Sequence, residues 1–130
     1  MRGRRIPKAK PAIVIMEDDP EMRSFYSKNL RDHCEIFFLT TRTEVVDFKK
    51  NTDFRNTNIR CIIVDGYFSE DNFKLSGVVY TIRNREFTGS IIAASDEFND
   101  ELMENGATDR PEGDLKKNVP ALVLHSLGLD

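Results

Sequence analysis

The amino-acid sequence predicts an α/β fold in which a doubly wound parallel sheet is covered by helices on both faces. Short runs of apolar and β-branched residues recur along the chain, and segments with apolar residues at helical spacing lie between them. Nearly continuous apolar runs are typical of strands that are buried on both faces. Since right-handed crossovers place each connecting helix on one face of the sheet, this alternation indicates a doubly wound architecture.

The expected strands and helices follow one another in a regular order. Apolar runs predict strands at 12–16, 34–39, 59–64 and 90–94, and a short polar segment at 106–111 predicts an abbreviated fifth strand that ends in proline. Helical spacing predicts a helix after each strand, the fourth of them beginning near Asp96. Pro120 lies inside the last helical pattern and is expected to kink or delay that helix.

The length and charge of the chain indicate one acidic domain. With 130 residues and 39% hydrophobic content, the chain can bury one hydrophobic core. Five of the 19 basic side chains lie in the first ten residues, which leaves 14 basic against 22 acidic side chains in the rest. We therefore expect a basic, flexible leader at 1–10 and a domain at 11–130. The acidic body argues against nucleic-acid binding, because that affinity comes mainly from Lys and Arg neutralising phosphates.

The sequence also argues against a membrane protein. No apolar run approaches the roughly 20 residues of a membrane-spanning helix, and no apolar segment of a signal peptide follows the basic leader. We expect a cytoplasmic protein with no membrane partner. Cys34 and Cys61 lie beside apolar strands without the spacing of a metal-ligand motif, so both are expected to be buried and reduced.

Acidic and hydroxyl side chains follow three of the predicted strands. Glu17 and Asp18 come directly after the first strand, Asp65 after the third and Ser95 after the fourth. Ligands of doubly wound sheets bind beyond the carboxyl ends of the strands, near the point where strand order reverses. If the first and third strands are neighbours, the three carboxylates converge, and a hard divalent cation relieves their repulsion. Mg²⁺ is the natural candidate because it prefers carboxylates, waters and phosphate oxygens.

Each of these signals taken alone has a simpler interpretation. Asp19 followed by proline is a good helix start, and the two acids before it are compatible with an extension of that start. Asp65 before a glycine is compatible with a turn, and Ser95 with a helix cap. Capping does not require acids after two neighbouring strands together with a hydroxyl after another, so the combination favours a metal site.

A metal site of this kind indicates phosphoryl transfer. A carboxylate beside a divalent cation can attack phosphorus to form an aspartyl phosphate, while a hydroxyl and backbone N–H groups hold the phosphoryl oxygens. Asp65 is the expected nucleophile, and Ser95 is the expected hydroxyl.

These residues resemble those of response-regulator receiver domains, the CheY-like family, over 11–129. The stretches that carry the resemblance are 13–20, 62–65, 91–95 and Gly106-Ala107. The resemblance implies a flavodoxin-like, five-stranded sheet of order 2-1-3-4-5, with Glu17 and Asp18 as the acidic pair and Asp65 as the phosphoacceptor. It also implies that Tyr67 is a Mg²⁺ ligand through its backbone carbonyl and that the Ser95 hydroxyl responds to phosphorylation.

The sequence departs from the family's pattern at the lysine that pairs with the phosphoryl group. Gapless counting puts Gly113 where the family has a lysine followed by proline. We prefer Arg110, which precedes a proline, as the substitute; Lys116 or Lys117, reaching in from the last helix, is the alternative. Because a guanidinium and an ammonium approach phosphate differently, slow or weak phosphorylation is expected.

Two further departures concern switching and the loop after Asp65. Gapless counting puts Arg110 at the family's aromatic switch position, so any switching is expected to use other side chains. The loop at 66–73 is longer and more acidic than usual and lacks the family's proline, and Glu70 and Asp71 in it are expected to be solvated.

Two functions remain open at this point. The leading hypothesis is a receiver in two-component phosphorelay signalling, which accepts a phosphoryl group on Asp65 from a histidine kinase or phosphotransfer protein and signals to a downstream protein. The alternative is a degenerate receiver that serves as a phosphorylation-independent docking module, which the missing lysine favours. A phosphatase is disfavoured because Tyr67 stands where an acid or base is needed. We expect no enzymatic activity beyond self-catalysed phosphorylation and dephosphorylation.

Overall fold

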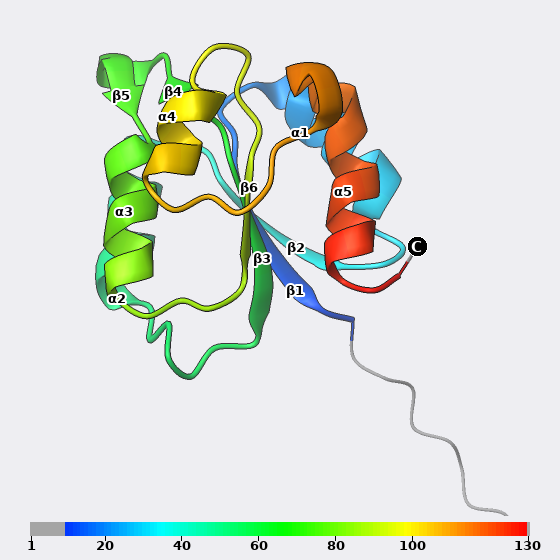
Figure 1. Cartoon of the computed structure of the whole chain (residues 1–130), viewed down its shortest axis with the longest axis horizontal. Helices are drawn as coiled ribbons and strands as arrows, with labels where there is room; N and C mark the ends of the chain where they lie inside the picture. The colour runs from blue at the N-terminus through cyan, green and yellow to red at the C-terminus, as the bar shows by residue number, and fades with distance from the viewer. Residues whose placement is uncertain (1–9, 130) are drawn as a thin grey trace, which may run out of the picture.

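Four parallel strands form the central layer of the molecule. The computed structural model describes residues 10–129, so most of the leader expected at 1–10 lies outside the described residues. The strands are β1 (Ala12–Met16), β2 (Glu35–Leu39), β3 (Ile59–Val64) and β6 (Ser90–Ala93). They pair in the order β2-β1-β3-β6, which confirms the doubly wound prediction (Figure 1).

The fifth strand of the sheet is reduced to a single bridge. Asp109 pairs with Ile92 of β6, and its carbonyl accepts the N–H of Ala93 at 2.8 Å. Pro111 follows two residues later and has no N–H to extend a ladder. The abbreviated strand expected from the sequence is therefore present in its shortest form.

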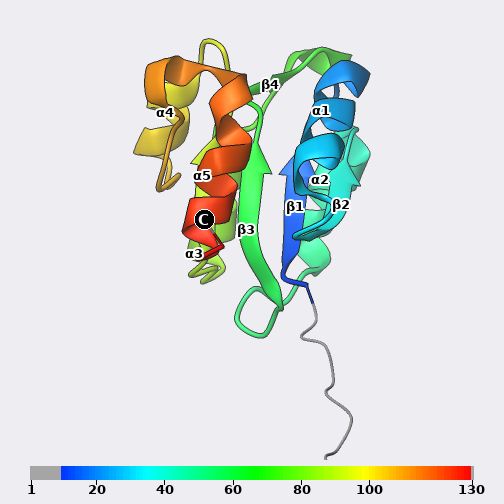
Figure 2. The same ribbon diagram turned by 90° about the vertical axis from the view of Figure 1, so that its right-hand side faces the viewer.

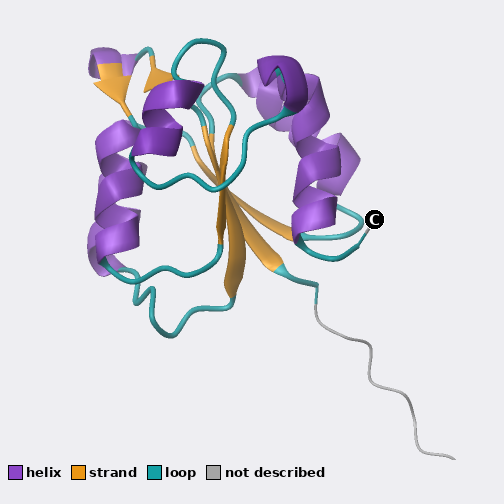
Figure 3. Cartoon of the chain, in the orientation of Figure 1, coloured by secondary structure: helices purple, strands orange, loops and turns teal. Residues whose placement is uncertain are grey.

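Helices cover both faces of this sheet. The helices α2 (Arg42–Asn51), α3 (Ser76–Asn84) and α4 (Asn99–Glu104) lie on one face, and α1 (Pro20–Leu30) and α5 (Val119–Ser126) lie on the other (Figures 1 and 3). None of the helices within the described residues has the length and apolar character needed to span a bilayer.

Alternate side chains of β1 pack into two hydrophobic cores, one on each face of the sheet. Val14 and Met16 belong to the core under α2 to α4, whereas Ile13 and Ile15 belong to the core under α1 and α5. Because both faces of the strand are buried, its sequence is apolar throughout rather than alternating. Burial also raises the pKa of the Cys61 thiol to about 12. Both cysteines are free and buried, as predicted.

Local signals set where the helices begin. Asp19 caps α1 by accepting the N–H of Glu21 at 3.0 Å, as predicted. The start of α5 is delayed until Val119, after the 3₁₀ turns Glu112–Asp114 and Lys116–Asn118. The predicted delay by proline is therefore confirmed.

The segment after β3 forms a hairpin that was not predicted. The strands β4 (Tyr67–Phe68) and β5 (Phe73–Lys74) are antiparallel and are joined by a 3₁₀ turn at Glu70–Asn72. Figure 2 shows the hairpin at the end of the sheet where α1 begins. Although exposed, Glu70 accepts the N–H of Arg42 at 3.2 Å, so the acidic loop is attached to α2.

Candidate metal and phosphoryl site

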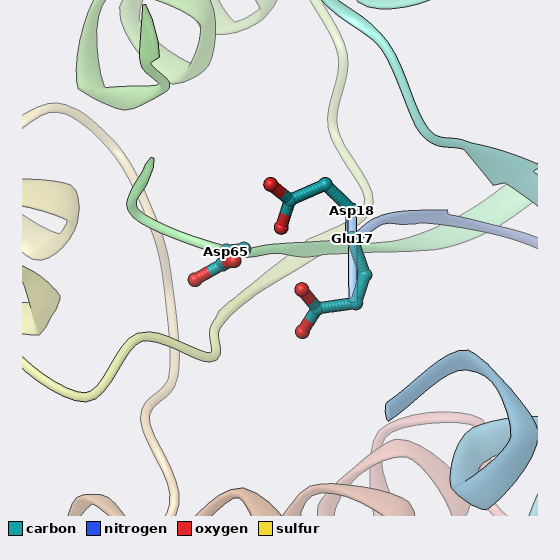
Figure 4. A group of neighbouring side chains, drawn as sticks. All are labelled: Glu17, Asp18 and Asp65. Atoms are coloured by element: carbon teal, nitrogen blue, oxygen red, sulfur yellow. The ribbon is translucent and has the colours of Figure 1, made fainter. Parts of the chain in front are cut away.

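The carboxyl ends of β1 and β3 bring three acids together. Met16 is in register with Val64, so the residue after each strand leaves the sheet at the same edge. Carboxylate oxygens of Glu17, Asp18 and Asp65 lie within 4.8 Å of one another. Figure 4 shows the three side chains extending from the ends of the two strands. The convergence expected from the sequence is present.

An open cavity of about 350 Å³ lies over these acids. Its walls come from the ends of three strands, the β4–β5 hairpin, the turn before α4 and the turn before α5. The lining residues are Glu17, Asp18, Asp19, Asp65, Tyr67, Ser69, Ser95, Asp96, Glu97, Phe98 and Lys116. Of the candidate site residues expected from the sequence, Arg110 and the alternative Lys117 do not line it.

Glu17 and Asp65 form the buried floor of the site. They are 1% and 8% exposed, respectively, although ionised carboxylates are rarely buried without a partner. Oδ1 of Asp65 accepts the N–H of Gly66 at 2.8 Å. Oε1 of Glu17 accepts from the ammonium of Lys116 at 3.2 Å, and that nitrogen lies 3.6 Å from Oδ1 of Asp65.

The rim of the site is made by Asp18 and the hairpin. Oδ2 of Asp18 accepts the N–H of Ser69 at 2.8 Å, which ties the end of β1 to the loop that follows β4. The ring of Tyr67 lies 6.2 Å from that of Phe98, and the ammonium of Lys74 lies 5.0 Å from the centre of the Phe98 ring. These contacts close one side of the cavity with aromatic rings.

The crowded negative charge changes the acidity of Asp65. Burial and then the neighbouring Glu17 raise the pKa of Asp65 to about 8, and Lys116 and the Gly66 N–H offset only part of this rise. Burial, and then the charges of Glu17 and Asp65, raise the pKa of Tyr26, whose buried hydroxyl has no hydrogen-bond partner in the described part of the chain. A divalent cation fits this set of oxygen donors because it removes the repulsion among them.

The cation beside the acids is Lys116, which corrects the preference for Arg110. Nε and Nη2 of Arg110 each donate to the carboxylate of Asp114 at 2.8 Å, and Nη1 bonds Asp100. Gapless counting assumes an extended strand, whereas Gly113 and Asp114 both have positive φ, and Lys116 beyond them lines the cavity. Lys116, the alternative that the sequence left open, fills the place next to Asp65.

The hydroxyl of Ser95 closes the turn before α4, at the mouth of the cavity. It accepts the N–H groups of Glu97 at 3.2 Å and Phe98 at 3.0 Å. This turn explains why α4 begins at Asn99 rather than near Asp96. Ser95 lines the cavity that contains Asp65, which is where the sequence predicts a phosphoryl-binding hydroxyl.

Sequence reasoning missed Asn99, a buried polar residue that is 3% exposed. Its Oδ1 accepts the N–H of Ser95 at 2.8 Å, and its Nδ2 donates to Oδ1 of Asp114 at 3.0 Å. The position of Asn99 in the sequence could have identified it, because Asn99 shares a helical face with the apolar residues Leu102 and Met103. A polar residue on an apolar face needs hydrogen-bond partners.

Comparison with solved structures agrees with this geometry. A CheY-like response regulator receiver domain protein from Methanospirillum hungatei has a TM-score of 0.70 and 14% identity, with 92% of each chain covered. A two-component response regulator from Clostridium difficile has a TM-score of 0.69 and 16% identity, covering 92% of this chain and 97% of that one. A response regulator receiver protein from Pseudomonas putida has a TM-score of 0.68 and 18% identity, covering 95% and 100%.

The chain has the fold of a receiver domain. At these identities the likeness concerns the fold, and no protein-family model and no curated protein sequence matches the chain. Within the receiver fold, the acids, Ser95 and Lys116 meet at the carboxyl edge of the sheet. The structure therefore establishes the receiver fold.

Proposed function

We propose that this chain is a cytoplasmic response-regulator receiver that accepts a phosphoryl group on Asp65 from a histidine kinase or phosphotransfer protein. The observation that carries the proposal is the ammonium of Lys116 beside Asp65, in the cavity that also holds Glu17 and Asp18. A missing lysine was the main reason to favour a docking module. A lysine that reaches the carboxylates from another segment removes that reason.

The proposed metal ligands are Glu17, Asp18, Asp65 and the backbone carbonyl of Tyr67. The donor set suits Mg²⁺, since it offers carboxylate oxygens at an open cavity with room for waters and a phosphate. When bound, Mg²⁺ neutralises charge on the oxygens of the transferred group. The proposal for Tyr67 rests on the resemblance to receiver domains and on its position at the cavity wall.

Asp65 acts as the nucleophile in the proposed reaction. Its Oδ1 accepts the Gly66 N–H and faces Lys116, which leaves Oδ2 to attack phosphorus. A bond forms between that oxygen and phosphorus, while the bond from phosphorus to the donor's imidazole nitrogen breaks. The Lys116 ammonium and the Ser95 hydroxyl then hold oxygens of the phosphoryl group. The same site hydrolyses its own aspartyl phosphate, and we propose no turnover of an external substrate.

A phosphorylation-independent docking module is the second candidate, and one observation favours it. The fifth strand is a single bridge, and Arg110, at the place expected for an aromatic switch residue, is held by Asp114. The usual inward movement of an aromatic side chain is therefore not available at that position. In this second candidate the acids bind metal without controlling the choice of the downstream protein.

An NMR titration with Mg²⁺ followed by beryllium fluoride tests the proposed function. We expect Mg²⁺ to shift the amides of Asp18 and Asp65, and the fluoride to shift those of Ser95 and Lys116 only when Mg²⁺ is present. The Asp65→Asn variant should not respond to the fluoride. A metal response without any fluoride response in the native sequence would favour the docking module.

A further inference from the structure

The segment that carries Lys116 is not held by the sheet. The last sheet contact before it is the bridge at Asp109, and the chain then passes through two 3₁₀ turns before α5 begins. Gly113 and Asp114 have φ values of 68° and 55° within this segment. Such a segment needs other contacts to keep a long lysine side chain at a fixed place.

A hydrogen-bond network ties this segment to α4 and to the Ser95 turn. We call it the Asn99 network, and it consists of Asn99, Arg110 and Asp114. Two nitrogens of Arg110 donate to the carboxylate of Asp114, each at 2.8 Å from an oxygen. Asn99 donates to the same carboxylate at 3.0 Å and accepts the N–H of Ser95 at 2.8 Å.

The two ends of the network lie next to the two groups proposed to hold the phosphoryl oxygens. Asp114 precedes Lys116 by two residues, and its N–H donates to the carbonyl of Pro111 at 2.9 Å, which closes the turn. Asn99 meets the backbone of Ser95 itself. Two-point pairing of a guanidinium with a carboxylate is geometrically specific, and a buried amide bonded at both ends tolerates little displacement.

We infer that the Asn99 network positions Lys116 beside Asp65. It also fixes the Ser95 turn relative to Lys116. The inference rests on the proposed function for its purpose, but the placement of Lys116 can be measured without any phosphorylation. Arg110, Asp114 and Asn99 are positioning residues in this arrangement, because they act through Lys116 and Ser95. Arg110 thus supports the phosphoryl site from outside the cavity.

Amine labelling of the metal-free full chain tests the placement of Lys116. Lys116 has a side chain only 15% exposed, whereas the adjacent Lys117 is exposed and serves as an internal reference. An acylating reagent followed by peptide mapping gives the ratio of the two labelling rates. We expect Arg110→Ala to raise the relative labelling of Lys116 by roughly tenfold, the order that loss of a charge-assisted pair permits. Arg55→Ala, which removes the exposed pair with Glu86, should leave the ratio unchanged.

A near-isosteric variant separates the two halves of the network. Asn99→Asp keeps an oxygen for the N–H of Ser95 but places a carboxylate against the carboxylate of Asp114. We expect it to raise Lys116 labelling as Arg110→Ala does, with a native-like amide NMR spectrum. An unchanged labelling ratio in both folded variants would overturn the inference.

A double-mutant cycle with Lys116→Met then connects the network to the proposed chemistry. With a small phosphodonor and Mg²⁺, Arg110→Ala should slow adduct formation by roughly tenfold in the native background and have little effect once Lys116 is methionine. Equal slowing in both backgrounds would contradict action through Lys116. If the native chain forms no adduct while the labelling results hold, the proposed function fails and the positioning of Lys116 stands.

Discussion

The ammonium of Lys116 lies 3.6 Å from Oδ1 of Asp65 and reaches it from the turn before α5. In this place the cation offsets the charge of a buried carboxylate, and in the proposed reaction it pairs with an oxygen of the transferred phosphoryl group. A lysine supplied from outside the sheet also means that a short fifth strand does not by itself disable the site.

Removal of the Lys116 charge should weaken both the chemistry and the metal-free fold. We expect Lys116→Met to slow phosphorylation of Asp65 by roughly 10- to 100-fold, since one preorganised donor to the transferred group is lost. The variant should also lower the melting temperature in EDTA, because the buried Glu17 carboxylate then loses its cationic partner. Intact mass and thermal unfolding provide the measurements. Lys117→Met is the matched control, and an equal loss in that variant would contradict the role of Lys116.

The stability of the metal-free protein should depend on pH through Asp65. Its pKa in the folded state is raised to about 8. Between about pH 4, its ordinary value, and pH 8, the folded state therefore keeps a proton that the unfolded state has released. The contribution of this group to stability is full at the acid end and is lost as pH rises through about 8.

Urea unfolding in EDTA at several pH values checks this dependence. We expect the free energy of unfolding to fall with rising pH relative to Asp65→Asn, which cannot ionise at this position. Saturating Mg²⁺ should reduce this extra pH dependence of the native protein, since the cation stabilises the ionised carboxylate of Asp65. A gap between the two proteins that is independent of pH in EDTA would be inconsistent with the raised pKa.

Gly66 leaves the space that Ser95 occupies beside Asp65. A Cβ at position 66 would lie 2.6 Å from both Oγ of Ser95 and Cβ of Phe98. We expect Gly66→Ala to cost about 1–3 kcal/mol of stability and to slow phosphorylation, because the turn must move. Gly77→Ala is the control, since no atom lies within 4 Å of its added Cβ, and it should be neutral or slightly stabilising. Comparable losses in both variants would rule out local crowding as the cause.

Phosphorylation should open the hydrogen-bonded turn that precedes α4. Ser95 Oγ accepts the amides of Glu97 and Phe98, and it leaves them if it turns toward a phosphoryl oxygen. We expect faster hydrogen exchange at these two amides after phosphorylation. The amide of Ala94, bonded to Val64 in the sheet at 2.9 Å, should keep its rate. Unchanged exchange at Glu97 and Phe98 would mean that switching, if present, does not pass through Ser95.

Much of the fold was predictable because its strands are buried on both faces. The apolar runs matched β1 and β3 at both ends, and the acids after them were expected to converge. The β4–β5 hairpin was missed because strands of two residues carry no periodicity. The helix α4 begins later than predicted because the hydroxyl of Ser95 accepts the amides of Glu97 and Phe98 in a turn before the helix.

The identity of the cation was harder to predict from sequence. Counting along the chain assumes an extended strand up to the lysine, whereas here the chain turns at Gly113 and Asp114. Arg110 carries the expected charge and the expected following proline, but its partners are the carboxylates of Asp114 and Asp100. A bidentate pair of this kind depends on the path of the loop, which no local pattern in the sequence encodes.

Intact mass after incubation with Mg²⁺ and a small phosphodonor tests the central claim most directly. The samples are the native chain, Asp65→Asn, and the native chain in EDTA. We expect one phosphoryl adduct on the native chain with Mg²⁺ and none in the other two samples. No adduct on a folded native chain that binds Mg²⁺, or an adduct that persists in Asp65→Asn, would contradict the assignment of Asp65 as the phosphoacceptor.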